Sequence, residues 1–196
     1  SVHYVIDDLL PLAAESFELP GDYRDRLARF AATLLPRILE LQPIVVAPSQ
    51  AILDLFPRLG HRLLDPCCLA LRGCDGLPPL ASWQGPMRIA FLGTRSHVGT
   101  LPLIDAISAR LQQASPQTRL HLFFGRHLPA ALTRRANILN RPPIAWPQYL
   151  DFCRRTRFHI GLAPVQDTAF AKARSITKLM DHAAVGAVGL YSDRAP

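Results

Sequence analysis

Two stretches of the chain carry the polar residue types that phosphate binding requires. The first, Gly93–Thr100, reads Gly-Thr-Arg-Ser-His-Val-Gly-Thr and follows an apolar run. Gly93 would let a ligand approach the backbone, Thr94 and His97 offer hydrogen bonds, and Arg95 offers a planar fork for phosphate. The stretch is neither a dinucleotide-binding glycine pattern nor a Walker A loop, since no Gly-Lys-Ser/Thr follows. An ordinary strand-to-helix turn is therefore an equally good interpretation.

The second stretch lies at the start of a helix expected over residues 175–185. Arg174, Lys178 and Asp181 are spaced four and three residues apart, which predicts that they share one side of this helix. Ser175 stands at the expected helix start, where backbone N–H groups and the positive dipole end favour an anion. A diphosphate would find donors and two cations there, and a free Asp181 carboxylate would accept from a sugar diol. The alternative is a solvated charged face with an internal Lys178–Asp181 pair.

A pair of carboxylates, Asp7 and Asp8, follows the first apolar run. They are candidates for groups that face a catalytic cleft, and the alternative is that they are turn or helix-capping residues. No histidine-rich cluster lies near them in sequence, so this pair does not indicate a metal site. We expect no bound metal and no resident cofactor.

Short apolar runs alternate with amphipathic ones along the chain. The apolar runs predict strands at 2–6, 44–47, 62–64, 87–92, 119–124, 158–163 and 188–191. The amphipathic runs predict helices at 23–41 with a kink or break at Pro36, 49–56 with Ser49 as N-cap, 101–114, 129–139, 146–155 and 175–185. This alternation is typical of an α/β, Rossmann-like fold, in which helices cover both faces of a parallel sheet.

Ligands of such sheets bind outside the carboxyl ends of the strands. The rule selects four loops, at residues 93–100, 125–127, 164–174 and 192–196. The helix over 175–185 is expected to face the sheet with an apolar stripe, and Gly186 is expected to end it. The residues of that stripe are Ile176, Leu179, Met180, Ala183 and Ala184.

The overall composition narrows the class of protein. Of the 196 residues, 49% are hydrophobic, which is enough for a packed core, and the formal net charge is +7. A basic chain can bind nucleic acid, an anionic membrane surface or phosphorylated small molecules, and an Arg-rich soluble protein is the plainer explanation. No block of five or six like charges occurs, so we expect no nucleic-acid partner. No apolar stretch reaches the length of a transmembrane helix, and peripheral membrane contact stays open.

The 4 cysteines, Cys67, Cys68, Cys74 and Cys153, include no Cys-x-x-Cys pair. A zinc ribbon or a thioredoxin site is therefore disfavoured, and free thiols in a reducing cytoplasm are expected.

Glycine and proline punctuate residues 72–86, which we interpret as a linker between two units. The expected domains are residues 1–75, a linker at 76–86, and residues 87–196. The chain does not begin with Met, and we expect it to be a piece of a longer protein.

Several stretches occur in the order of one known family. They are Phe158–Pro164, Asp167–Phe170, Lys172–Gly186 and Gly189–Asp193, with Ile89–His97, Leu120–Gly125, Val5–Leu9 and Val45–Ser49 upstream. Together they resemble bacterial glycosyltransferases of the "group 1" type, which have the two-Rossmann-domain GT-B fold. Arg174-Ser175 is similar to the Lys-Ser pair of that family, and Lys178 matches its Lys. Asp181 stands where the family usually has Glu, and Ala173 stands at the first acidic position.

The resemblance implies a glycosyltransferase that uses a nucleotide diphosphate sugar as donor, with an unidentified acceptor, in polysaccharide or cell-surface glycan synthesis. Residues 1–75 would be the tail of the acceptor-side domain, and 87–196 an incomplete donor domain. It implies donor-binding roles for Gly93, Thr94, Arg95, His97, Arg174, Ser175, Lys178 and Asp181, with Asp181 on the ribose. The alternative is a non-catalytic, glycosyltransferase-like nucleotide-binding or scaffold protein. With most of the acceptor domain missing, we expect these 196 residues to transfer no sugar by themselves.

Overall fold

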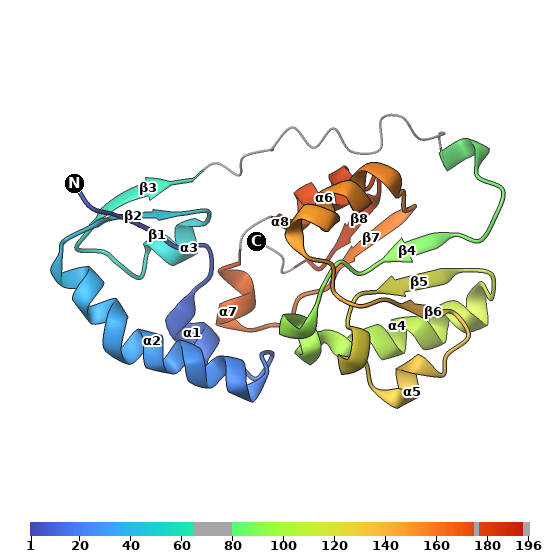
Figure 1. Cartoon of the computed structure of the whole chain (residues 1–196), viewed down its shortest axis with the longest axis horizontal. Helices are drawn as coiled ribbons and strands as arrows, with labels where there is room; N and C mark the ends of the chain where they lie inside the picture. The colour runs from blue at the N-terminus through green and yellow to red at the C-terminus, as the bar shows by residue number, and fades with distance from the viewer. Residues whose placement is uncertain (65–79, 175–176, 194–196) are drawn as a thin grey trace. The chain divides into compact units, whose positions relative to one another are not determined.

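Two separate parallel β-sheets are present in the computed structural model, which describes residues 1–64, 80–174 and 177–193 (Figure 1). Every strand pairing among these residues is parallel. Helices connect and cover the strands, so the predicted α/β, Rossmann-like class is confirmed. Within the same residues, no helix combines the length and the apolar character needed to cross a membrane.

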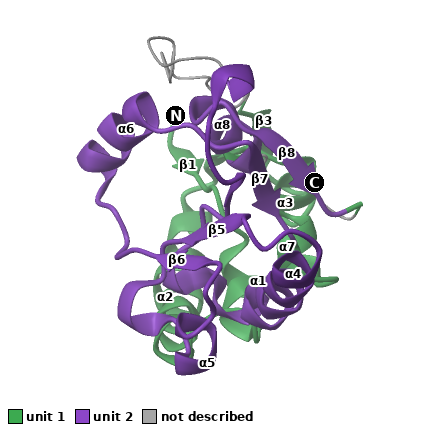
Figure 2. Ribbon diagram, turned by 90° about the vertical axis from the view of Figure 1, so that its right-hand side faces the viewer, with its two compact units in different colours: residues 1–67, 165–177, 193–196 green, residues 68–164, 178–192 purple. Residues whose placement is uncertain are grey.

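The chain divides into two compact units, which Figure 2 shows in different colours. Unit 1 comprises residues 1–67, 165–177 and 193–196, and unit 2 comprises residues 68–164 and 178–192. Residues 165–177 thus leave unit 2 and pack with unit 1. The sequence-based division at 1–75, 76–86 and 87–196 stays a prediction. Residues 76–79 of the expected linker lie outside the described residues, and Leu80–Ser82 forms the short 3-10 helix η1.

Unit 1 is built on a sheet with the strand order β1-β2-β3. Its strands are β1 (His3–Val5), β2 (Ile44–Ala47) and β3 (Gly60–Leu63). Its helices are α1 (Leu10–Glu15), α2 (Gly21–Glu40), α3 (Gln50–Leu53) and α7 (Ala169–Lys172). The core joins apolar side chains of β1, β2 and the four helices, including Val45 of β2, Ile52 of α3 and Phe170 of α7, whereas the residues of β3 are exposed.

Helix α2 continues through Pro36, so the predicted break at this proline is wrong. Its neighbour α3 begins as predicted, because the Ser49 side chain accepts a hydrogen bond from the Ile52 N–H at 3.4 Å. Helices α1 and α7 fall in segments that we had expected to be loops. Both bury small or aromatic residues in the core of unit 1, which stabilises short helices that a sequence pattern does not reveal.

Unit 2 contains a five-stranded sheet with the order β6-β5-β4-β7-β8. Its strands are β4 (Arg88–Ala90), β5 (Arg119–Leu122), β6 (Ile138–Asn140), β7 (Ile160–Ala163) and β8 (Val188–Tyr191). Four of these strands lie within or at the predicted positions, and their parallel pairing confirms the predicted sheet over residues 87–191. The fifth, β6, is a correction.

The prediction of a helix over 129–139 is wrong in its second half. Helix α5 spans only Ala130–Thr133, and Ile138–Asn140 pairs as an edge strand with β5. Asn140 fixes this pairing, because its side-chain oxygen accepts from the backbone N–H groups of Phe124 and Gly125, each at 3.2 Å. Long-range pairing thus overrides the local helical pattern.

Helices cover both faces of the unit 2 sheet (Figure 1). On one face, α4 (Leu101–Ala114) and α5 pack over Ile89, Leu120 and Leu122. On the other face, α6 (Trp146–Arg155) and α8 (Thr177–Ala184) pack over Ala90 and Phe158. Alternate residues along a strand therefore pack into two different hydrophobic cores, one on each face, as expected of a parallel sheet that helices cover on both faces.

Helix α8 meets the sheet with only part of the predicted stripe, of which Ala184 is buried and Ile176 lies outside the described residues. Leu179 is 51% exposed and Ala183 is exposed, whereas His182, Ala184 and Val185 are buried. The reason is a close contact with β7: a Cβ on Gly161 would overlap the His182 ring, so the imidazole lies directly against the strand. Gly186 ends the helix with a φ of 64°, which confirms the predicted stop.

Candidate functional site

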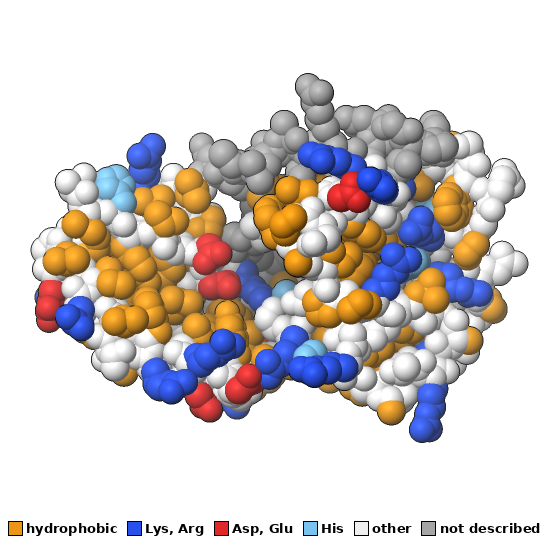
Figure 3. Space-filling model, viewed as in Figure 1, with side chains coloured by type: hydrophobic (Ala, Val, Ile, Leu, Met, Phe, Trp, Pro, Cys, Tyr) orange, Lys and Arg blue, Asp and Glu red, His pale blue; other side chains and the backbone are white. Residues whose placement is uncertain are grey.

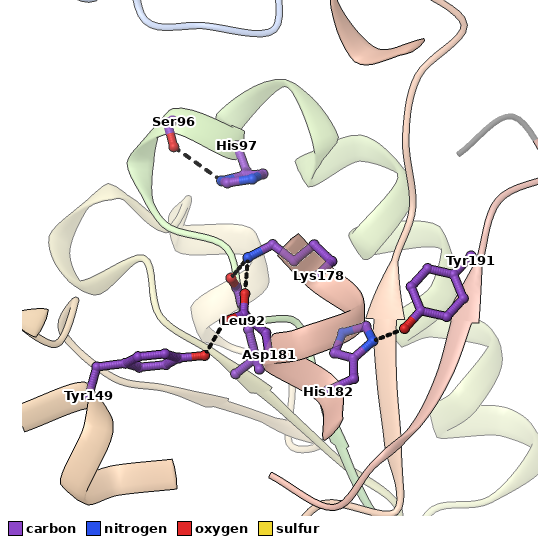
Figure 4. Close-up of polar contacts among 8 residues, drawn as sticks. All are labelled: Leu92, Ser96, His97, Tyr149, Lys178, Asp181, His182 and Tyr191. Atoms are coloured by element: carbon purple, nitrogen blue, oxygen red, sulfur yellow. Dashed lines mark hydrogen bonds and ion pairs between the residues drawn. The ribbon is translucent and has the colours of Figure 1, made fainter. Parts of the chain in front are cut away.

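The loop that follows β4 meets helix α8 at the carboxyl edge of the unit 2 sheet (Figure 4). The Lys178 ammonium donates a hydrogen bond of 2.6 Å to the Leu92 carbonyl oxygen, one residue before Gly93. The same ammonium forms an ion pair of 2.8 Å with Asp181. The two side chains are 29% and 22% exposed, so both remain partly accessible to solvent. The structure thus brings together two of the segments that the sequence analysis singled out.

A tyrosine that the sequence analysis did not single out completes this group. The Tyr149 hydroxyl on α6 donates a hydrogen bond of 2.8 Å to the second oxygen of the Asp181 carboxylate. The phenol ring is stacked between those of Trp146 and Phe152, with centroid distances of 5.8 and 6.3 Å. The expectation that Asp181 has a free carboxylate is therefore wrong: each of its oxygens already has a partner.

Burial shifts the pKa values of the groups around the Asp181 carboxylate. It raises the pKa of the Tyr149 phenol, and the negative charge of Asp181 raises it further. Tyr149 is therefore a neutral donor at every physiological pH. Burial together with the Lys178 charge lowers the pKa of His182, whose Nδ1 lies 3.0 Å from the Tyr191 hydroxyl on β8. A neutral imidazole behind Lys178 adds no second positive charge to the site.

A small open pocket lies beside these residues, with a volume of about 40 Å³. Its walls are formed by residues from the loops after β4 and β5 and from the start of α6, namely Leu92, Thr94, Phe123, Ile144 and Tyr149. Two of them form hydrogen bonds with the Lys178–Asp181 pair: the Leu92 carbonyl accepts from Lys178, and the Tyr149 hydroxyl donates to Asp181. Pockets that hold drug-sized ligands have volumes of roughly 300–1,000 Å³, so a nucleotide requires this one to widen.

Gly93 serves packing in this structure. The residue is buried, and a Cβ at this position would overlap the Phe91 ring and lie 3.0 Å from the His97 ring. The His97 imidazole contacts Phe91 edge-on at 5.8 Å and lies 3.1 Å from the Ser96 hydroxyl. The absence of a side chain at Gly93 therefore lets the loop fold back on the strand, which differs from the predicted approach of a ligand to the backbone.

Thr94 and Arg95 differ in their exposure to solvent. Thr94 is exposed and lines the pocket. Arg95 is half-buried and begins the 3-10 helix η2 (Arg95–Thr100), which leads into α4. The predicted helix after this loop is confirmed by α4 (Leu101–Ala114), and Thr94 is the N-cap residue of the 3-10 helix before it.

Arg174 precedes the described part of α8. It belongs to unit 1, and its guanidinium lies over the Phe170 ring at 5.0 Å from the centroid. The described part of α8 begins at Thr177, and Ser175, the predicted anion-binding hydroxyl, lies outside the described residues. The spacing argument that grouped Arg174 with Lys178 and Asp181 assumes one continuous helix from residue 174, and this grouping stays a prediction.

The predicted carboxylates Asp7 and Asp8 follow β1 in unit 1. Asp7 is exposed and Asp8 is half-buried. Burial raises the pKa of Asp8, the Arg174 charge opposes this shift, and the Asp7 charge adds to it. Asp8 and Arg174, which the sequence analysis treated as unrelated, therefore influence one another electrostatically.

No pattern in the sequence predicted that Tyr149 or the Leu92 carbonyl would be part of the candidate site. Tyr149 is 32 positions from Asp181, and Leu92 is 86 positions from Lys178, so only the packing of α6, α8 and β4 brings them together. Among the described residues, no group of three or more His, Cys, Asp or Glu side chains is placed to hold a metal ion. Cys153 is a buried free thiol, and the other three cysteines lie outside the described residues.

Comparisons with protein-family models, with curated proteins and with solved structures gave no match to this chain.

Proposed function

We propose that the protein binds a nucleotide diphosphate sugar at the Lys178 site of unit 2 and transfers its sugar to an acceptor. The observation that carries this proposal is the meeting of the β4 loop with α8, where Lys178 and Asp181 lie together at the carboxyl edge of a parallel sheet. This edge is the usual ligand site of such folds. The resemblance of residues 158–193 to donor domains of group 1 glycosyltransferases points to the same place.

The role of each residue in donor binding follows from its charge. Lys178 supplies a positive charge for the diphosphate, so it stabilises the charge that develops on the leaving group without a metal ion. Asp181 accepts hydrogen bonds from the ribose hydroxyls. Thr94 and Arg95 contact the donor from the β4 loop, and Asp7 or Asp8 acts on the acceptor. The acceptor belongs to polysaccharide or cell-surface glycan synthesis, on the cytoplasmic side.

Donor binding requires an exchange of partners at Asp181. In the structure Tyr149 donates to this carboxylate and also forms a wall of the small pocket. A ribose hydroxyl that replaces the Tyr149 hydroxyl would keep the carboxylate satisfied while the tyrosine moves and the pocket widens. The exchange costs little free energy, because one hydrogen bond to a charged group replaces another.

The experiment is calorimetry with a nucleoside diphosphate and with the matching nucleoside. Lys178→Ala should weaken nucleoside diphosphate binding by about 1.5–3 kcal/mol, the value of a hydrogen bond to a charged group, and leave the nucleoside unchanged. Asp181→Asn should weaken both ligands alike, because it acts on the ribose. Equal losses for both ligands in both variants would show that this division of roles is wrong.

The chain offers a matched control, since its other lysine is also ion-paired. Lys172 forms a surface pair of 2.7 Å with Asp167 in unit 1. Lys172→Ala removes the same charge and should leave both affinities unchanged. Tyr149→Phe removes the competitor for Asp181 and should tighten nucleoside binding. If Lys172→Ala weakens binding as much as Lys178→Ala, the effect is one of net charge and the site is wrong.

A second function is favoured by one observation: Lys178 and Asp181 already satisfy each other beside a pocket of about 40 Å³. This suits a non-catalytic nucleotide-binding or scaffold protein. Release of nucleoside diphosphate from a nucleotide sugar supports the transferase. Nucleotide binding without any release, at donor concentrations well above Kd, supports the scaffold.

A further inference from the structure

A second group of cations lies on the face of the unit 2 sheet that α6 and α8 cover. Arg88 precedes Ala90 by two residues on β4, so both point to this face, and Ala90 is paired with His121 on β5. His121 is paired in turn with Leu139 on β6, and Arg141 follows Leu139 by two residues. Three neighbouring strands thus each place one cationic or titratable side chain on the same face.

Aromatic rings hold the Arg88 guanidinium in a fixed orientation. It lies over the Phe158 ring at 4.8 Å and over the Trp83 ring at 5.3 Å. Phe158 is fully buried, whereas Trp83 is 41% exposed, so the guanidinium extends from the core toward the surface. Such stacking fixes the plane of the donors and leaves their edges for an oxyanion.

His121 lies on β5, between the strand that carries Arg88 and the strand that leads to Arg141. Its side chain is 4% exposed, its ring lies 5.0 Å from Phe158, and its Nδ1 has no hydrogen-bond partner among the described residues. Burial and the charges of Arg88 and Arg141 lower the pKa of His121 to about 4, and Arg141 also lowers the pKa of Arg88. These groups therefore lie close enough to repel one another.

Unit 2 contains too few acidic residues to neutralise this repulsion. Its sequence holds thirteen Arg and Lys against four Asp and no Glu, a formal net charge of +9. The three of these aspartates that the structure describes, Asp105, Asp151 and Asp181, are each paired with another cation, namely Arg135, Arg155 and Lys178. Figure 3 shows Lys and Arg side chains gathered over β4 and β5.

We propose that Arg88, His121 and Arg141 form a binding site for the phosphate group of a small phosphorylated molecule, separate from the Lys178 pocket. Two guanidinium groups and one imidazole N–H supply several donors and two full positive charges, which fits a dianionic oxyanion better than a single carboxylate. The bound anion would offset the repulsion between the two guanidinium groups and give the unpartnered imidazole nitrogen a hydrogen-bond partner. The exposed Trp83 ring is a surface on which the rest of the molecule can lie.

Thermal unfolding followed by tryptophan fluorescence tests this site, because both tryptophans, Trp83 and Trp146, belong to unit 2. The additions are inorganic phosphate, a nucleoside monophosphate and sodium chloride at matched ionic strength, at pH 7.5. A phosphate concentration of one hundred Kd should raise Tm by roughly 10–20 °C more than chloride does. The two phosphate compounds distinguish free phosphate from a phosphate group on a larger ligand.

The variants separate a bound anion from a general salt effect. Arg88→Gln and Arg141→Gln should each lose at least half of the phosphate-specific shift. Arg110→Gln, an exposed arginine on α4 at the opposite face, should keep all of it. Arg141 is exposed, so its variant tests the site even if Arg88→Gln does not fold. Equal phosphate shifts in all three variants would overturn the proposal.

One further variant and one further ligand complete the test. Lys178→Ala should keep the full phosphate shift, which makes this site independent of the proposed donor site. A single-stranded oligonucleotide at equal phosphate concentration should stabilise unit 2 no more than the nucleoside monophosphate does. A much larger shift with the oligonucleotide would identify a nucleic acid as the ligand and overturn the assignment to a small molecule.

Discussion

At the scale of single residues, His121 makes the stability of unit 2 depend on pH. Its pKa is about 4 in the folded protein, against the ordinary histidine value of 6.5. Between these values the unfolded chain binds a proton that the folded chain does not, so stability falls as the pH falls from 6.5 to 4. The expected loss is about 3 kcal/mol over this window, and none of it arises above pH 7.

Denaturant unfolding at pH 7.5, 6 and 4.5, followed by tryptophan fluorescence, measures this dependence. His121→Leu should remove part of the decline that the wild type shows between pH 6 and 4.5, and the lowered pKa of His182 contributes to the decline that is left. His127→Gln, at a half-buried histidine of the same unit, should leave the decline in place. If His121→Leu and the wild type lose stability in parallel, the titration of His121 is not the cause.

At the scale of elements, the segment 165–174 is anchored to unit 1 by side chains at both of its ends. Thr168 caps α7 by accepting from the Ala171 N–H at 3.0 Å, and it donates to the buried Glu18 carboxylate. Near the other end, the Ser49 hydroxyl donates to the Ala173 carbonyl oxygen at 2.8 Å. Phe170 lies between these contacts in the core of unit 1.

Removal of the first anchor should loosen this segment. Thr168→Val deletes the cap and leaves Glu18 without this donor, at a cost of about 2–4 kcal/mol. Hydrogen exchange of residues 165–174 should accelerate by at least tenfold. Thr33→Val removes a similar hydroxyl from an exposed position on α2 and should change nothing there. Unchanged exchange in Thr168→Val would mean that core packing alone holds the segment.

At the scale of the whole molecule, charge is distributed very unevenly. Unit 2 carries a formal charge of +9, whereas unit 1 carries −2, although the chain as a whole is +7. Along the sequence no block of five or six like charges occurs, so the imbalance becomes clear only when residues are grouped by contact. Self-repulsion of this size opposes the compact state of unit 2.

Added chloride should therefore stabilise unit 2. At 0.15 M salt the Debye length is about 8 Å, so repulsion between its exposed arginines is largely screened. The tryptophan unfolding midpoint should rise by a few degrees between 10 and 150 mM sodium chloride, because about 1 kcal/mol corresponds to several degrees in a domain of this size. A midpoint that is unchanged or falls would show that the excess charge is already balanced in the fold.

The sequence by itself determined the architecture of unit 2 and much of its candidate site. Apolar runs marked four strands of the sheet, because parallel strands covered on both faces must be apolar along their whole length. Loops after these strands were predicted to carry the polar groups, and Lys178 and Asp181 indeed lie beside Leu92 at the carboxyl edge. The Lys178–Asp181 pair had been weighed from spacing alone, since three residues along a helix bring two side chains together.

Only the tertiary structure decided which residues join across long separations. Residues 138–140 became a strand because an edge of β5 was available to pair with them. Arg174 joined Asp8 and Phe170 in unit 1 because residues 165–177 return to that unit. The Tyr149 hydroxyl donates a hydrogen bond to the Asp181 carboxylate, which was predicted to be free. Arg88, His121 and Arg141 lie on one face of the sheet. Such contacts depend on how helices and strands pack, and local periodicity records only which face of an element is apolar.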